Sequence, residues 1–222
     1  MMKRYLDDEL KQLNINILKM AAMVEEAIHR SVEALRKQDK KEALSVIKND
    51  QKIDDMEVAI EEEVIDLFAL FQPLACDLRF ITTGMHINTE LERIADLTVN
   101  ISQRVLDLAD QPLVKPVNDI DKLANQAKVM VKNSIDSFVN RDQELAKEVI
   151  FSDKESNRLR TSIIRELIDD YMMKDSSSIP KAVPLLLVAR DLERICDHAA
   201  SIAEDVIYMI QAKVIKQHRE LL

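Results

Sequence analysis

Glycine, aromatic residues and cysteine are scarce in this chain of 222 residues. Glycine occurs once, at Gly84, tryptophan is absent, and aromatic residues make up 4% of the chain. Sheets favour β-branched and aromatic runs joined by glycine-rich turns, so this composition disfavours them. Ala, Leu, Ile, Val, Glu, Lys, Asp and Met are plentiful instead, and we predict an all-α fold.

Basic clusters and long apolar runs are also missing. The net charge of −9 argues against a nucleic-acid partner, because binding to phosphates depends mainly on Lys and Arg. The longest apolar run, residues 182–189, is far short of the roughly 20 residues that span a bilayer. The first residues, MMKRYLDDELKQ, place acids where a signal peptide would be apolar. We therefore predict a cytoplasmic protein that does not insert into membranes.

Two cysteines and a lack of catalytic motifs narrow the function further. Cys76 and Cys196 are expected to be free thiols in a reducing compartment. We find no Gly-rich phosphate loop, no nucleotide fingerprint, and no Ser-His-Asp or Cys-His set at a telling spacing. These absences predict a protein that is not an enzyme.

Apolar residues recur with helical period along most of the chain. Near the amino terminus they follow one another four and three residues apart, at Leu6, Leu10, Leu13, Ile17, Met20 and Val24. Similar stripes, with Pro73 and the proline-containing segment 110–118 as breaks, predict six helices. We place them at residues 3–38, 41–71, 74–109, 119–140, 143–173 and 180–217.

A repeat divides this pattern into two similar halves. The sequence LERIADLTVNI at residues 91–101 returns as LERICDHAASI at residues 192–202, a shift from 91 to 192 of 101 residues. Three long helices joined by short turns pack antiparallel. We therefore predict two tandem antiparallel three-helix bundles related by pseudo-twofold duplication, at residues 1–110 and 117–222.

Acidic residues lie in pairs at the spacing of one helical turn. Glu92 and Asp96 in the first copy of the repeat correspond to Glu193 and Asp197 in the second. Each pair shares a helix face, where like charges repel. Such a pair, present in both copies, raises the question of a bound cation.

The preceding helix of each half carries matching polar pairs. Asp50 and Asp54 lie at the edge of an apolar stripe about 20 residues before the Pro73 turn, and Glu92 lies about 20 residues after it. Antiparallel packing would bring these acids level. In the second half, Asp153 and Asn157 take the corresponding places. Clusters of oxygen ligands suit Mg²⁺, Mn²⁺, Ca²⁺ or iron, and zinc is less natural without Cys or His.

Two less specific interpretations stay open. Chance alone gives roughly seven acidic pairs at this spacing, and Arg93, Arg194 or nearby lysines could neutralise the acids as surface ion pairs. The sequence Glu26-Ala-Ile-His29 matches one element of di-iron enzymes, which need two copies inside a four-helix bundle. A surface position is the more common outcome for His29, and a structural one for His198.

Three segments resemble one known family. LERIAD at residues 91–96, LERICDHAASIAED at residues 192–205 and QPLACDLR at residues 72–79 are similar to the PhoU proteins, bacterial accessory regulators of phosphate-specific transport. The resemblance covers nearly the whole chain in order. It implies a negative regulator of phosphate uptake and phosphate-starvation signalling, which is cytoplasmic and homodimeric.

The resemblance also implies partners and ligands. The expected partners are the ATPase subunit of the phosphate ABC transporter and, where the cell has one, a sensor histidine kinase. The loop around Asp77 and Arg79 becomes a candidate partner surface. Family members bind single or multinuclear metal ions at E(D)xxxD motifs, and we expect Fe, Mn, Mg or Zn. The matching residues here are Asp50, Asp54, Glu92, Asp96, Asp153, Glu193 and Asp197.

The second half departs from the family pattern. Asn157 stands where the second Asp is expected, and Ser201 replaces the Asn seen at Asn100. Ala95 and Cys196 occupy places where the family commonly has Gly. These departures weaken the match of the second metal site. A di-iron or di-manganese carboxylate enzyme and a plain helical adaptor without metal are the alternative functions.

Overall fold

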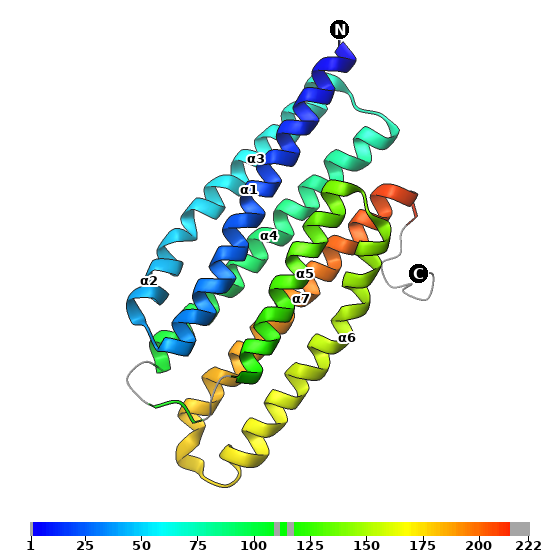
Figure 1. Cartoon of the computed structure of the whole chain (residues 1–222). Coiled ribbons are helices and arrows are strands. Elements are labelled where there is room, and N and C mark those ends of the chain that lie inside the picture. The colour runs from blue at the N-terminus through cyan, green and yellow to red at the C-terminus, as the bar shows by residue number, and fades with distance from the viewer. Residues whose placement is uncertain (1, 109–111, 115–117, 214–222) are drawn as a thin grey trace.

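The protein is a bundle of long helices, which the computed structural model in Figure 1 shows from the side. The structure describes residues 2–108, 112–114 and 118–213. A π-helical turn, η1 (Leu167–Met172), continues α6, and a short 3-10 turn, η2 (Ser176–Ser178), precedes α7. The α-helices are α1 (Met2–Lys37), α2 (Lys40–Asn49), α3 (Gln51–Phe71), α4 (Ala75–Leu108), α5 (Asn118–Asn140), α6 (Gln143–Glu166) and α7 (Ile179–Gln211). The all-α prediction is confirmed.

The apolar stripe of the first helix faces the core as its spacing predicts. Leu13, Ile17, Met20 and Val24 of α1 are completely buried. Each such side chain contributes about 1.5–3 kcal/mol when removed from water. The helix is therefore held mainly by tertiary packing of this face.

The two halves begin their middle helices with the same local signal. Asp39 precedes α2, and its Oδ1 accepts hydrogen bonds from the backbone N–H groups of Lys41 and Glu42. Asp142 caps α6 in the same way, bonding Glu144 and Leu145. An aspartate N-cap stabilises a helix by about 1 kcal/mol. The caps are 103 residues apart (142 minus 39), as expected for a duplicated unit.

The predicted helix at residues 41–71 is interrupted, which corrects the sequence-based prediction. The break lies at Asp50, whose backbone stays helical (φ −55°, ψ −39°) but whose carbonyl accepts from both Ile53 N at 2.7 Å and Asp54 N at 3.1 Å. The first of these bonds tightens the turn to 3-10 geometry. Asn and Asp are poor residues for a helix interior, and the chain bends where Asn49 and Asp50 adjoin.

Two further helix ends differ from prediction. The helix predicted over residues 143–173 closes with the π-helical turn, in which Met173 N bonds Ile168 O, five residues back. Helix α7 ends at Gln211, because Ala212 takes a left-handed conformation with φ of 57°. The predicted end at Gln217 and the predicted boundaries at residues 109, 110, 117 and 222 lie outside the described residues.

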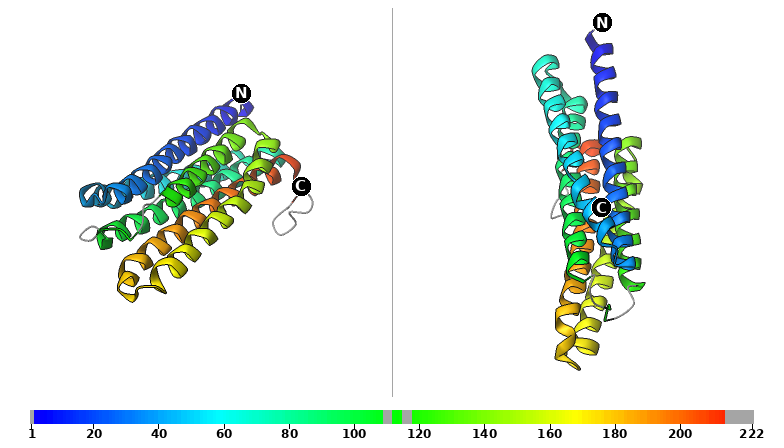
Figure 2. Two further views of the ribbon diagram at one scale, coloured as in Figure 1. Left: turned by 60° about the horizontal axis from the view of Figure 1, so that its bottom comes forward. Right: turned by 90° about the vertical axis from the view of Figure 1, so that its left-hand side faces the viewer.

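The helices form two antiparallel three-helix groups that lie side by side. One contains α1, α2–α3 and α4, and the other contains α5, α6 and α7 (Figure 2). Helices α4 and α7 run antiparallel along the centre and form the largest helix–helix contact. Phe80 of α4 stacks on Phe138 of α5, with ring centroids 5.0 Å apart. Buried residues of both groups form one continuous core, so the halves pack as one body.

The single glycine marks a close approach between α4 and α1. A Cβ atom at Gly84 would lie 3.0 Å from Ile17 Cδ1 and 3.4 Å from Leu13 Cδ2. Gly84 is itself buried. The absence of a side chain lets the two helices pack closely here, at a cost of about 1 kcal/mol in helix propensity.

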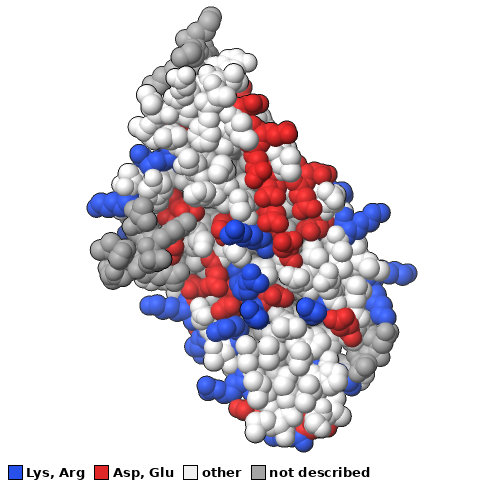
Figure 3. Space-filling view, turned by 180° about the vertical axis from the view of Figure 1, so that it is seen from behind, with Lys and Arg blue, Asp and Glu red and all other residues white. Residues whose placement is uncertain are grey.

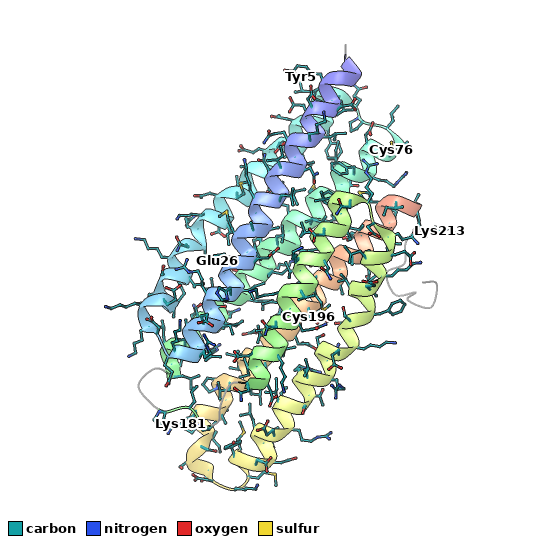
Figure 4. All side chains as sticks on the ribbon, in the orientation of Figure 1. Tyr5, Glu26, Cys76, Lys181, Cys196 and Lys213 are labelled. Carbon is teal, nitrogen blue, oxygen red and sulfur yellow. The ribbon has the colours of Figure 1, made fainter. Side chains whose placement is uncertain are left out.

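The cysteines and the helix lengths agree with the composition. Cys76 is exposed at the start of α4, Cys196 is buried in α7, and Figure 4 shows them in different parts of the molecule. Both are free thiols, as predicted. Among the helices of the described residues, none combines the length and apolar character needed to cross a bilayer.

Candidate functional site

The acids of the first half converge where the α2–α3 bend meets α4. Asp50 lies at the bend, Asp54 and Glu57 follow on α3, and Glu92 and Asp96 lie on α4. The first four are half-buried and Asp96 is exposed. The structure thus brings together the two pairs that the antiparallel hairpin predicts. We call these five residues the first acidic cluster.

Burial and mutual repulsion raise pKa values in this cluster. Burial, followed by the charges of Asp54 and Asp96, raises the pKa of Asp50 to about 6. Burial, Asp96, Glu57 and Asp54 together raise the pKa of Glu92 to about 7. Each neighbouring charge that acts on these two groups is itself a carboxylate. The first acidic cluster therefore concentrates carboxylates whose charges repel one another.

The nearby arginines are directed elsewhere. Arg93 pairs with Glu90, one turn back on α4, at 3.3 Å. Arg194 acts on Asp191, lowering a pKa that burial raises. The alternative to a cation site was that Arg93 and Arg194 neutralise the paired acids. In these contacts, neither arginine pairs with Glu92 or Asp96.

The acids of the second half come together between α6 and α7. Asp153 and Glu193 are buried, and Asp197 lies at the exposed edge. Burial, Glu193 and Asp153 raise the pKa of Asp197 to about 6, while His198 opposes the shift. These three acids form the second acidic cluster, and all seven predicted site residues thus fall into two groups, one in each half.

Polar partners distinguish the second cluster from the first. The Asn157 amide donates to Asp153 Oδ2 at 3.4 Å and to its backbone oxygen at 3.2 Å. Arg160 Nε lies 3.4 Å from Glu193 Oε1. A charged guanidinium is thus part of the second cluster.

Sequence reasoning missed Glu57 and Arg160. The position of Glu57 could have been recognised, because Glu57 follows Asp54 by three residues and so lies on the same helix face. The shift of 103 that relates Asp50 to Asp153 also relates Glu57 to Arg160. Comparing the two helices position by position would have identified both residues.

The side chains do not stand in a preassembled coordination shell. Within the described part of the chain, no group of three or more His, Cys, Asp or Glu side chains is placed to enclose an ion. A cavity of about 450 Å³ opens beside Asp50, lined also by Met23, Arg30 and Lys52. The donor set, five carboxylates, fits a hard or borderline cation, and binding one requires the carboxylates to reorient.

The histidines noted in the sequence take other roles. Glu26 lies in the C-terminal half of α1 (Figure 4), and His29 is exposed one turn further on. His198 Nδ1 lies 2.6 Å from Glu90 Oε2, linking α7 to α4. A structural contact for His198 and a surface position for His29 agree with the more common outcomes expected for such residues.

Charge is unevenly distributed over one face of the molecule. Figure 3 shows Asp and Glu gathered in a band over the upper half of this face, whereas Lys and Arg are interspersed with acids lower down. Helix α3 contributes to this acidity with Asp54, Glu57, Glu61, Glu62 and Asp66, among others. The two ends of the face thus differ in electrostatic potential.

Comparison with known proteins identifies the family. A model of the PhoU domain matches residues 17–105 and again residues 120–206. The chain belongs to the PhoU family. The two matched PhoU domains correspond to the two helical halves, and each contains one acidic cluster.

Relatives of similar length support this assignment. The chain is 41% identical over 211 residues to the phosphate-specific transport system accessory protein PhoU homolog of Aquifex aeolicus, covering 95% of each chain. It is 36% identical to the homolog of Clostridium acetobutylicum, covering 97% of this chain and 98% of the relative. The crystal structure of PhoU from Pseudomonas aeruginosa superposes with a TM-score of 0.89 at 33% identity, covering 93% of this chain and 99% of the other. The PhoU resemblance seen in the sequence is confirmed.

Proposed function

We propose that this protein is an accessory regulator of phosphate-specific transport, acting by binding other proteins and not by catalysis. The observation that carries this proposal is the double PhoU-domain match, with relatives named as phosphate-specific transport accessory proteins over nearly their whole length. The rigid helical body, which shares one core across both halves, suits a docking scaffold.

The regulator is further proposed to hold a divalent or multinuclear metal (Fe, Mn, Mg or Zn) on the first acidic cluster. Asp50, Asp54, Glu92 and Asp96 would hold it, with Glu57 as an additional ligand or neighbouring charge. Support comes from the concentration of half-buried carboxylates, because burial and the neighbouring acids together raise the pKa values of Asp50 and Glu92. A bound cation would supply the missing positive charge and draw α3 and α4 together.

Docking is proposed to involve the ATPase subunit of the phosphate ABC transporter and a sensor histidine kinase. The α3–α4 turn supports a contact surface, because Leu70 and Leu74 are 71% and 77% exposed. Arg79 fixes the start of α4 by donating to Met209 O of α7 at 3.1 Å. Each partner would shift the balance between free and docked forms according to its differential affinity for them. The homodimer and the cytoplasmic location stay predictions.

A pull-down with the transporter's ATPase subunit, at low and high phosphate, tests the docking role. The subunit is expected to retain this protein, and the double variant Leu70→Glu, Leu74→Glu is expected to lose binding while remaining folded. Failure to bind under either condition would count against the docking role.

The proposed metal binding is tested separately by elemental analysis of protein prepared without chelator. Bound metal is expected in the parent and is expected to fall in Asp54→Asn and Glu92→Gln. Metal-free parent protein would support a plain adaptor, and turnover with O₂ would support a carboxylate oxidase.

A further inference from the structure

The two acidic clusters differ at two equivalent positions. With the shift of 103, Asp54 corresponds to Asn157 and Glu57 corresponds to Arg160. The remaining positions keep their acids, since Asp50 corresponds to Asp153. On the last helix of each half, the shift of 101 relates Glu92 and Asp96 to Glu193 and Asp197. Among the positions that form the two clusters, only those on the middle helix have therefore changed.

These changes alter the charge that each cluster presents. The first cluster has five carboxylates, a formal charge of −5. The second has three carboxylates and one guanidinium, a formal charge of −2. Attraction for a divalent cation becomes weaker when fewer negatively charged ligands surround it, and a nearby positive charge weakens it further.

The geometry shows where the positive charge of the second cluster lies. Arg160 Nε is buried and makes no hydrogen bond, but it lies at ion-pair distance, 3.4 Å, from Glu193 Oε1. Glu193 is itself only 8% exposed. On the other side, the Asn157 amide donates to Asp153 Oδ2 at 3.4 Å. Two of the three carboxylates thus have a protein partner.

We infer that Arg160 is the built-in counter-ion of the second acidic cluster, so that this chain takes up divalent metal in its first half and not in its second. Arg160 supplies the positive charge that a bound metal ion would supply in the first cluster. The inference rests on the proposed metal binding of the first half and specifies which half performs it. It differs from the sequence-based prediction that Asp153, Glu193 and Asp197 form a second metal site, and the experiment below decides between the two.

A reciprocal exchange of the two differing positions tests this. Chelator-treated protein is titrated with Mn²⁺ by calorimetry in the parent, in Asn157→Asp with Arg160→Glu, and in Asp54→Asn with Glu57→Arg. The parent is expected to bind metal in a way that Glu92→Gln abolishes. The first double variant is expected to gain binding that persists when Glu92→Gln is added, and the second to lose the parent's binding. Parent protein that keeps half of its metal with Glu92→Gln would overturn the inference.

A metal-free measurement tests Arg160 even if the parent binds no Mn²⁺. In excess chelator, Arg160→Gln is expected to lower Tm by about 3–6 °C, because it leaves buried Glu193 without its counter-charge. Arg160→Lys should restore much of the loss. At the equivalent position, Glu57→Gln is expected to leave Tm unchanged or raise it, since it relieves repulsion. An Arg160→Gln protein as stable as the parent would overturn the counter-ion role, whereas absent metal binding in every protein would overturn the proposed metal function alone.

Discussion

Glu90 of α4 and His198 of α7 meet where the two helices pack together, with Oε2 and Nδ1 2.6 Å apart. Each side chain is only 16% exposed. The positions related to them by the shift of 101 are Asp191 and Leu97, which cannot make the same contact. This pair therefore joins the two halves at a place where the pseudo-twofold symmetry is broken.

Removing this contact is expected to destabilise the packing of the two halves. His198→Ala removes the partner of Glu90 on α7 and leaves it only Arg93 on its own helix, and we expect a loss of about 1–2 kcal/mol in the free energy of unfolding. Urea unfolding at neutral pH measures it. His86→Ala is the matched control, because His86 lies 3.5 Å from Asp205 across the same pair of helices but is 54% exposed. That variant should lose less than about 0.5 kcal/mol; equal losses would contradict the prediction.

The raised pKa values predict how the stability of metal-free protein depends on pH. The pKa of Asp50 is about 6 against an ordinary 3.8, and that of Glu92 is about 7 against 4.5. Between the ordinary and the raised values, the folded state binds more protons than the unfolded state. The contribution of these groups to stability therefore falls as pH rises through this window and is lowest above the raised pKa values.

This effect is measurable as a difference between proteins. After allowing for solvent screening, we expect it to amount to about 1 kcal/mol, or about 2–4 °C in Tm, between roughly pH 5 and pH 8. The variant Asp50→Asn with Glu92→Gln should gain stability relative to the parent as pH rises. A constant Tm difference between the two proteins across this range would refute the assignment.

Metal binding is expected to reverse the same repulsion. Ligand at one hundred times its Kd stabilises a folded protein by about 2.7 kcal/mol. We therefore expect added Mn²⁺ to raise Tm, chelator to return it, and the effect to weaken below about pH 6, where protonation of Asp50 and Glu92 competes with the metal. A Glu92→Gln protein is the control. An equal Mn²⁺ effect in this variant would show that the ion acts elsewhere.

Gly84 offers a test of the close packing between α4 and α1. Gly84→Val places branched carbons against Ile17 and Leu13, and overpacking of this kind costs about 1–3 kcal/mol. Gly84→Ala should be nearly neutral, since the gain in helix propensity offsets contact with the mobile end of Ile17. Thermal unfolding of both variants shows whether close packing or helix propensity determines the stability at this position. A Gly84→Val protein with a higher Tm than the parent would contradict the close approach of α4 and α1.

The acidic pairs show how far spacing alone can reach. Glu92 with Asp96 and Asp50 with Asp54 were recognised because residues four apart share a helix face, and the hairpin connection placed the pairs at the same level. Spacing could not reveal which charges lie nearest once the helices pack. Arg93, the obvious counter-ion in sequence, turns along its own helix to Glu90, while Arg160, 33 residues before Glu193, reaches that carboxylate across a helix interface.

The sequence by itself determined the helical class, the duplication and the identity of the buried face, since Leu13, Ile17 and Met20 follow a period that only a helix satisfies. Tertiary structure decided the bend at Asp50, the contact of Glu90 with His198 and the contact of Arg160 with Glu193. The physical reason is that periodicity is a property of one helix, whereas bends, ion pairs and pKa values depend on what the neighbouring helix presents at a distance of a few ångströms.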